Sequence, residues 1–168
     1  MSDSRRHPRV VNLDELSPRS FGRGEKFSAQ GRALGRATGS RSIGCSWFEV
    51  PPGRAAFPHH YHCVNEEALF VLEGRGTLRI GDDAVELRAG DYVTFALGPE
   101  HAHQLRNTGD TPLRYLCLST LVNADVVGYP DSKKIGALAT APGTQESWVR
   151  FIARESSHVD YFDGEDVD

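Results

Sequence analysis

The chain has 168 residues, of which 39% are hydrophobic and 25% are charged, and its formal net charge at pH 7 is -4. This length suits one compact domain and is short for two. The sequence contains no apolar run near the roughly 20 residues of a membrane helix, and the basic segment 1–6 is not followed by the apolar stretch of a secretory signal. We therefore expect a soluble, cytoplasmic protein with no membrane partner.

The charges are unevenly distributed along the chain. Residues 1–41 contain nine Lys or Arg and four Asp or Glu, whereas residues 155–168 contain six acids and no Lys or Arg. The arginines near the N-terminus are scattered and not interleaved with aromatic residues, so we expect no nucleic-acid partner. The three cysteines are too widely spaced for a C-x-x-C site or a disulfide framework, and reduced thiols are expected.

In chain order, the first segment is a candidate N-terminal arm. Residues 1–41 are rich in Gly, Arg and Ser and show little periodicity. Residues 42–121 then show short apolar or alternating runs separated by turn residues, which is typical of an all-β sandwich or barrel with mostly antiparallel strands. Strands are predicted near Ile43–Val50, Phe57–Cys63, Ala68–Glu73, Gly76–Ile80, Ala84–Arg88, Tyr92–Phe95, Ala102–Asn107 and Leu113–Ser119.

The remaining residues, 122–168, are predicted to form a C-terminal extension that wraps the barrel. They contain turn signals at 128–131 and 141–143, one strand-like run at Ser147–Ala153, and the acidic end. A second subunit could cover the N-terminal arm and the exposed barrel edges, and a two-fold dimer is the commonest closed assembly. A homodimer is therefore expected.

Five of the seven histidines fall in two short segments, residues 57–62 and 98–103. Side chains alternate across a strand, so His60 and His62 share one face, whereas His59 faces the other way. Glu67 enters the next predicted strand and His103 begins a later one, so a closed sheet could bring all four together. Three imidazoles and one carboxylate suit one divalent transition metal ion (Zn, Fe, Mn, Ni, Cu or Co) better than Ca or Mg. An H-x-H pair alone, however, is often only an exposed polar face.

The glycines around these residues complete a longer pattern. Residues 53–74 read G-x6-H-x-H-x4-E-x6-G, and residues 90–107 read G-x7-G-x4-H-x3-N. This resembles the paired signature of the cupin superfamily (RmlC-like), which implies a double-stranded β-helix (jelly-roll) barrel with a metal ion on His60, His62, Glu67 and His103. The spacing departs from the family pattern after Gly98. Counting from Gly98 selects His101 as the fourth ligand, and counting back from Asn107 selects His103.

The segments 129–134 and 161–165 resemble a bacterial subgroup of small single-domain cupins. The superfamily covers many reactions, so the resemblance implies a metal-binding cupin without selecting a substrate. The leading hypothesis is a metal-dependent enzyme with isomerase-like Lewis-acid chemistry on a sugar, sugar phosphate, or hydroxy or keto acid, with His101 as a candidate base. The alternatives are a non-catalytic module that binds or senses a small molecule, and an Fe(II) dioxygenase. Arg54, Arg79 and Arg106 are candidates for phosphate recognition.

Overall fold

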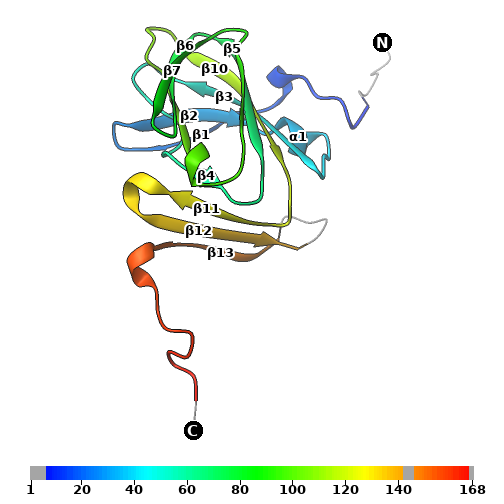
Figure 1. Cartoon of the computed structure of the whole chain (residues 1–168). Coiled ribbons are helices and arrows are strands. Elements are labelled where there is room, and N and C mark those ends of the chain that lie inside the picture. The colour runs from blue at the N-terminus through cyan, green and yellow to red at the C-terminus, as the bar shows by residue number, and fades with distance from the viewer. Residues whose placement is uncertain (1–6, 142–145, 167–168) are drawn as a thin grey trace.

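The computed structural model describes residues 7–141 and 146–166, which form mostly antiparallel β-strands (Figure 1). Within these residues, the helical elements are one short helix, α1 (Leu34–Ala37), and single 3-10 turns at Leu13–Glu15, Pro99–His101, Pro130–Ser132 and Glu155–Ser157. None of the helices in the described part of the chain has the length and apolarity needed to cross a membrane. The all-β prediction is confirmed.

One layer of the barrel is a six-stranded sheet in the order β1-β2-β3-β10-β5-β8. Its central pair is β3 and β10, which are antiparallel along their whole length, with Leu113 opposite Val50 and Thr120 opposite Ile43. The strands of this sheet are β1 (Arg19–Arg23), β2 (Phe27–Arg32), β3 (Ile43–Val50), β5 (Glu67–Glu73), β8 (Tyr92–Phe95) and β10 (Leu113–Thr120).

The other layer consists of two smaller sheets, in the orders β7-β6-β9 and β13-β12-β11-β4. An isolated antiparallel bridge between His60 and His103 connects them, so the residues next to β4 lie beside β9. Figure 1 shows β11, β12 and β13 side by side at one end of the barrel. These strands are β4 (Tyr61–His62), β6 (Arg75–Ile80), β7 (Asp83–Arg88), β9 (His103–Arg106), β11 (Ala124–Tyr129), β12 (Lys134–Thr140) and β13 (Ser147–Arg154).

Alternate residues of both layers fill the barrel core. Val50, Val71 and Leu113 from the large sheet are fully buried, and Leu78 and Leu105 from the opposite layer pack into the same cluster. Each such side chain contributes about 1.5–3 kcal/mol to folding by leaving water.

The backbone conformation and the close packing at position 74 explain why this motif residue is a glycine. Gly74 links β5 to β6 with a φ of 82°, a left-handed conformation that disfavours other residues. A Cβ atom there would also lie 2.7 Å from the carbonyl oxygen of Pro112. Glycine therefore allows the chain to reverse tightly against the loop that precedes β10.

All eight strands predicted within residues 42–121 are present, but one is much shorter than expected. The run predicted at Phe57–Cys63 is regular strand only at Tyr61–His62. Pro58 has no N–H to donate to a ladder, which limits regular pairing at the start of this run. His60 nevertheless keeps an extended, bridged conformation, so the alternation of side chains survives.

The interpretation of residues 1–41 as an arm is wrong for residues 19–32. These residues form β1 and β2, which add to the edge of the large sheet through pairing of β2 with β3. Phe21 packs against Phe48 and Phe57, with ring centroids 6.0 and 5.6 Å apart. The sequence did not indicate this strand pair because residues 19–26 are rich in Gly and Arg and contain one large apolar residue, Phe21. The C-terminal extension likewise forms three strands, where the sequence indicated one.

Candidate metal centre

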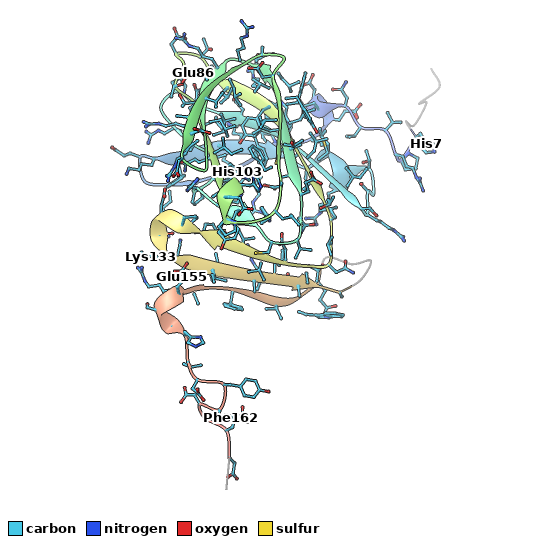
Figure 2. The ribbon with its side chains drawn as sticks, viewed as in Figure 1. His7, Glu86, His103, Lys133, Glu155 and Phe162 are labelled. Atoms are coloured by element: carbon cyan, nitrogen blue, oxygen red, sulfur yellow. The ribbon has the colours of Figure 1, made fainter. Side chains whose placement is uncertain are left out.

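The side chains of His60, His62, Glu67 and His103 converge inside the barrel. The Nε2 atoms of His60, His62 and His103 lie 3.7, 3.3 and 3.3 Å from Oε2 of Glu67. His60, His62 and Glu67 together present ligand atoms that lie within 4.8 Å of one another. Figure 2 labels His103 within the barrel, between the two layers. The structure thus brings together the four residues predicted as ligands, and it selects His103 over His101 for this cluster.

The other ring nitrogen of each histidine is already engaged. Nδ1 of His60 lies 2.8 Å from the carbonyl oxygen of Pro58, and Nδ1 of His103 lies 3.1 Å from that of His101. Nδ1 of His62 lies 2.6 Å from Oδ2 of Asp125. Carbonyl and carboxylate oxygens only accept hydrogen bonds, so each Nδ1 is the donor and each Nε2 is the nitrogen available to a metal. The donor set therefore fits a divalent transition metal ion.

Asp125 is a part of this site that the sequence interpretation missed. It is the second residue of β11 and is buried, and its carboxylate also accepts hydrogen bonds from the Val64 amide (3.0 Å) and from Nδ2 of Asn65 (2.9 Å). The carboxylate thus fixes both the ring of His62 and the loop between His62 and Glu67. The signal for it was an acid at the start of an alternating apolar run in residues 124–129, which the sequence interpretation did not recognise as a strand.

Replacing Asp125 with asparagine is expected to lower the affinity for a divalent transition metal by about 10–100-fold, as is typical when a carboxylate that orients a metal-binding histidine is lost. The amide oxygen can still accept from Nδ1 of His62, so the fold should be retained while the charge is removed. Competition with a chromogenic chelator measures the affinity. Asp83→Asn, at an exposed position in β7, is the matched control. Equal affinities for the two variants would contradict this role of Asp125.

The charges in the cluster are strongly coupled. Burial opposes protonation of His62, but hydrogen bonds and charge interactions with Glu67 and Asp125 outweigh it and raise the pKa of His62 to about 9. Burial alone would raise the pKa of Glu67, but the imidazoles of His103, His60 and His62 that face its carboxylate hold it well below its usual range. Burial lowers the pKa of His103. Without metal, His62 is therefore an imidazolium held between two carboxylates, and Glu67 is ionised.

Aromatic rings hold two of the histidines in place. The ring of Phe95 stacks on His103 with centroids 3.6 Å apart and planes 7° apart, and Tyr129 lies over His60 at 6.3 Å and 27°. Tyr129 comes from β11, like Asp125. Its pKa is raised by burial, so the phenol keeps its proton at neutral pH.

The cluster opens into a cavity of about 420 Å³ between the two layers of the barrel. Most of its wall is apolar, and its polar groups are few, which is the usual composition of a small-molecule site. Besides the four clustered residues and Tyr129, the wall is formed by Gly44, Cys45, Ser46, Phe48, Phe57, Pro58, Leu69, Phe95, Gln104, Leu105, Tyr115, Cys117, Ser119, Leu121 and Val127.

His101, the predicted base, does not line this cavity. It lies in the 3-10 turn Pro99–His101 rather than on the strand with His103, and its Nε2 is 3.7 Å from Oε1 of Glu100. Gly98, with a φ of 109°, starts this turn, so strand alternation begins only at His103. His101 therefore does not share a strand face with His103. His59 faces away from the cluster as expected, with Nδ1 3.4 Å from Oδ1 of Asp131.

The three arginines suggested for phosphate recognition are also outside the cavity wall. Arg79 is paired with Asp131 through Nη1, at 2.9 Å from both carboxylate oxygens. Nε of Arg106 donates to the carbonyl oxygen of Gly53 at 3.3 Å. Arg54, like the other two, is absent from the described residues that line the cavity.

The comparison with protein families agrees with this geometry. Residues 46–119, which contain Glu67 and His103 and all the strands between them, match the family model of the cupin domain. Residues 46–119 form a cupin domain. This domain provides the four clustered residues, whereas Asp125 and Tyr129 lie beyond it in the C-terminal extension.

The chain is also similar to proteins of different names. The chain is 37% identical over 70 residues to the uncharacterized protein MJ1618 of Methanocaldococcus jannaschii, covering 42% of this chain and 54% of that protein. It is 27% identical over 128 residues to the polyketide synthase CurC of Streptomyces cyaneus, covering 75% and 79%. The chain thus spans about half the length of MJ1618.

A solved structure shares the fold over most of both chains. It is a sugar phosphate isomerase from Silicibacter pomeroyi, with a TM-score of 0.75 and 21% sequence identity. The similarity covers 88% of this chain and 94% of that one. The cupin barrel and its N- and C-terminal strands therefore form one recurrent architecture.

Proposed function

We propose that this cupin is a metal-dependent enzyme that moves a proton on a small oxygenated metabolite, in an isomerase-like reaction. The observation that carries the proposal is the orientation of three imidazoles, whose Nε2 atoms all point to Glu67 while their Nδ1 atoms donate to fixed oxygens. Hydrogen bonds that fix the tautomer and the orientation of the ligand histidines in this way are typical of metal sites. The cavity beside them gives a substrate access.

A divalent ion held by His60, His62, Glu67 and His103 would supply Lewis-acid polarisation of a substrate carbonyl or hydroxyl oxygen. The residues around it orient the substrate and control water. Tyr129, which keeps its proton, can donate a hydrogen bond to a substrate oxygen beside His60. The apolar wall excludes water, which strengthens every polar interaction inside the cavity. Tyr129 is therefore the candidate proton donor, and His101, the base expected from the sequence, is not among the residues that line the cavity.

The cavity wall favours a substrate with an uncharged body. Among the described residues that line it, none is a lysine or an arginine, so a phosphate group would find neither of these usual partners there. Phe48, Phe57 and Leu69 instead offer apolar contact. We infer that the substrate is a hydroxy or keto compound whose oxygens face the histidines. The isomerase name of the Silicibacter pomeroyi structure and the polyketide synthase name of CurC are both compatible with chemistry next to a carbonyl.

Deuterium exchange tests the proposal. The protein is loaded in turn with Zn, Mn, Fe(II), Co and Ni, mixed with a panel of hydroxy ketones, keto acids, aldoses and ketoses in D₂O, and followed by NMR. Enzyme-dependent exchange at a carbon next to a carbonyl is expected. It should be lost in His62→Ala, and it should fall about 10²–10⁴-fold in Tyr129→Phe, the usual contribution of a positioned acid.

The same experiment separates the alternatives. Saturable binding of a panel compound without exchange would contradict the enzyme and favour a binding or sensing module. Oxygen consumption that requires Fe(II) and substrate would favour a dioxygenase instead.

A further inference from the structure

β13 (Ser147–Arg154) is an edge strand whose side chains are left uncovered on both faces. It ends the sheet β13-β12-β11-β4, and all its residues except Ala153 are exposed. Ile152, on one face, is 60% exposed, Phe151, on the other, is 52% exposed, and Trp148, at an irregularity in the pairing with β12, is 65% exposed. A long apolar edge strand with free backbone groups is a site for pairing with another chain, and native proteins normally cover it.

The segment after β13 carries an exposed pair of aromatic residues. Figure 1 shows residues 155–166 leading away from the barrel below β13, and Figure 2 labels Phe162 at the far side of this segment. Tyr161 and Phe162 are 88% and 61% exposed and contact each other edge to face, with centroids 4.9 Å apart. Four acids lie beside this pair, at positions 160, 163, 165 and 166. We call residues 159–166 the acidic tail.

A groove of opposite charge lies where β13 approaches the edge of the large sheet. It has a volume of about 790 Å³ and is lined by four arginines, namely Arg19, Arg32, Arg36 and Arg150. Among the described residues that line it, none is acidic. Its floor is aromatic, with Phe21, Phe48 and Phe57. We call this the arginine groove. A short acidic segment with an aromatic pair matches it in both charge and polarity.

We propose that a second copy of this chain binds along β13 and inserts its acidic tail into the arginine groove, so that each copy of a two-fold dimer exchanges tails with the other. A two-fold axis places identical strands antiparallel, so the end of the partner's β13 lies at the start of this β13. Arg150 is three residues from that start, roughly 10 Å along the strand. The nine residues from Arg154 to Asp163 span up to roughly 30 Å when extended, which is enough to reach the groove.

This arrangement also covers the apolar residues. Pairing of β13 with the β13 of the other copy provides hydrogen-bond partners for its free edge. It also joins the β13-β12-β11-β4 sheets of the two copies into one sheet. The neighbouring outward residues of β11 and β12, Val126 and Ile135, are 39% and 38% exposed and extend the apolar face around Phe151. The dimer expected from the sequence thus forms at the C-terminal strands, while β1 and β2 belong to the barrel itself.

Charge reversal in two separate chains tests the exchange of tails. Arg19→Glu/Arg36→Glu makes the groove acidic, and Asp163→Lys/Glu165→Lys makes the tail basic. Each variant alone places like charges together in both copies, so its dimer dissociation constant should rise at least roughly tenfold. An equimolar mixture of the two variants should dimerise again, because every tail then meets a groove of opposite charge. Light scattering measures the masses.

Rescue in the mixture cannot come from a tail that binds its own chain, so it identifies exchange between copies. The proposal is overturned by a monomeric wild type at the highest concentration that stays in solution, by wild-type dimerisation of both variants, or by a mixture that stays monomeric. Phe151→Lys tests the strand contact and should abolish the dimer. Tyr92→Lys, at a 61% exposed position on the opposite edge strand β8, should leave it intact. Circular dichroism checks that both variants are folded.

Discussion

Replacing Glu67 with glutamine is expected to lower the affinity for a divalent transition metal by about a hundredfold or more, because it removes the one anionic ligand. Loss of a residue that only orients a ligand typically lowers metal affinity by about 10–100-fold, so loss of the ligand itself should have the larger effect. The carboxylate of Glu67 is the atom group that all three histidines approach. The amide keeps the shape and loses the charge. Plasma mass spectrometry of protein purified without an affinity tag measures the bound metal, which should approach one equivalent in the wild type.

The chain offers a matched control at the preceding residue. Glu66→Gln removes the same charge from an exposed side chain. The hydrogen bond from the backbone amide of residue 66 to Oγ1 of Thr120 does not involve that side chain and should be kept. It should bind metal like the wild type. His60→Ala and His103→Ala should both lose the metal. Wild-type loading of Glu67→Gln, or wild-type protein that stays free of metal after reconstitution, would contradict the proposed metal centre.

The affinity should also depend on pH in a defined direction. The pKa of His62 is raised to about 9 in the metal-free protein, so its Nε2 carries a proton at neutral pH and must lose it before binding an ion. Affinity should therefore rise with pH up to about 9, by at most about tenfold per pH unit, and level off above it. Calorimetry in buffers of different ionisation enthalpy should detect release of a proton at pH 7.

The clustered residues could be predicted from the sequence because strand alternation relates His60 to His62 and because the spacing around Glu67 and His103 resembles the cupin signature. His60 and His62 share a face by strand alternation, and this holds even though β4 is only two residues long. Glu67 and His103 each begin a strand, as their positions after turn residues indicated. The turn at Gly98 was the weak point, because an irregular segment there moved His101 off the strand.

Asp125 could not be found in the same way because its role depends on a contact between distant segments. It lies 63 residues from His62, and only the pairing of β11 with β4 brings the two together. No spacing in the sequence reports that pairing. β1 and β2 were missed for a different reason: they contain few apolar residues and acquire their sheet position through β3. Residues that act through long-range pairing thus require the structure.

Replacing Asn107 with alanine is expected to destabilise the protein by about 3 kcal/mol, or roughly 6–12 °C in Tm for a chain of this size. Asn107 is fully buried, and its Nδ2 donates to the carbonyl oxygens of Val50 and Thr111, each at 2.8 Å. Its Oδ1 accepts from the amide of Gly109 at 2.9 Å. Alanine would leave these three backbone groups without their side-chain partner, one at the end of β3 and two in the loop between β9 and β10.

The isosteric variant Asn107→Asp separates lost hydrogen bonds from lost volume. It keeps the shape and the acceptor for Gly109, but it turns two donated hydrogen bonds into contacts between oxygens. Burial and the facing carbonyls raise the pKa of the new carboxyl, so its folded-state pKa exceeds the unfolded value. Its destabilisation relative to wild type should therefore be largest near pH 7 and shrink as the pH falls and the carboxyl regains a donor. Asn123→Ala, at an exposed position, should change stability by less than about 0.5 kcal/mol. Equal stability of Asn107→Asp and wild type at pH 7 would show that this loop does not depend on the Asn107 donors.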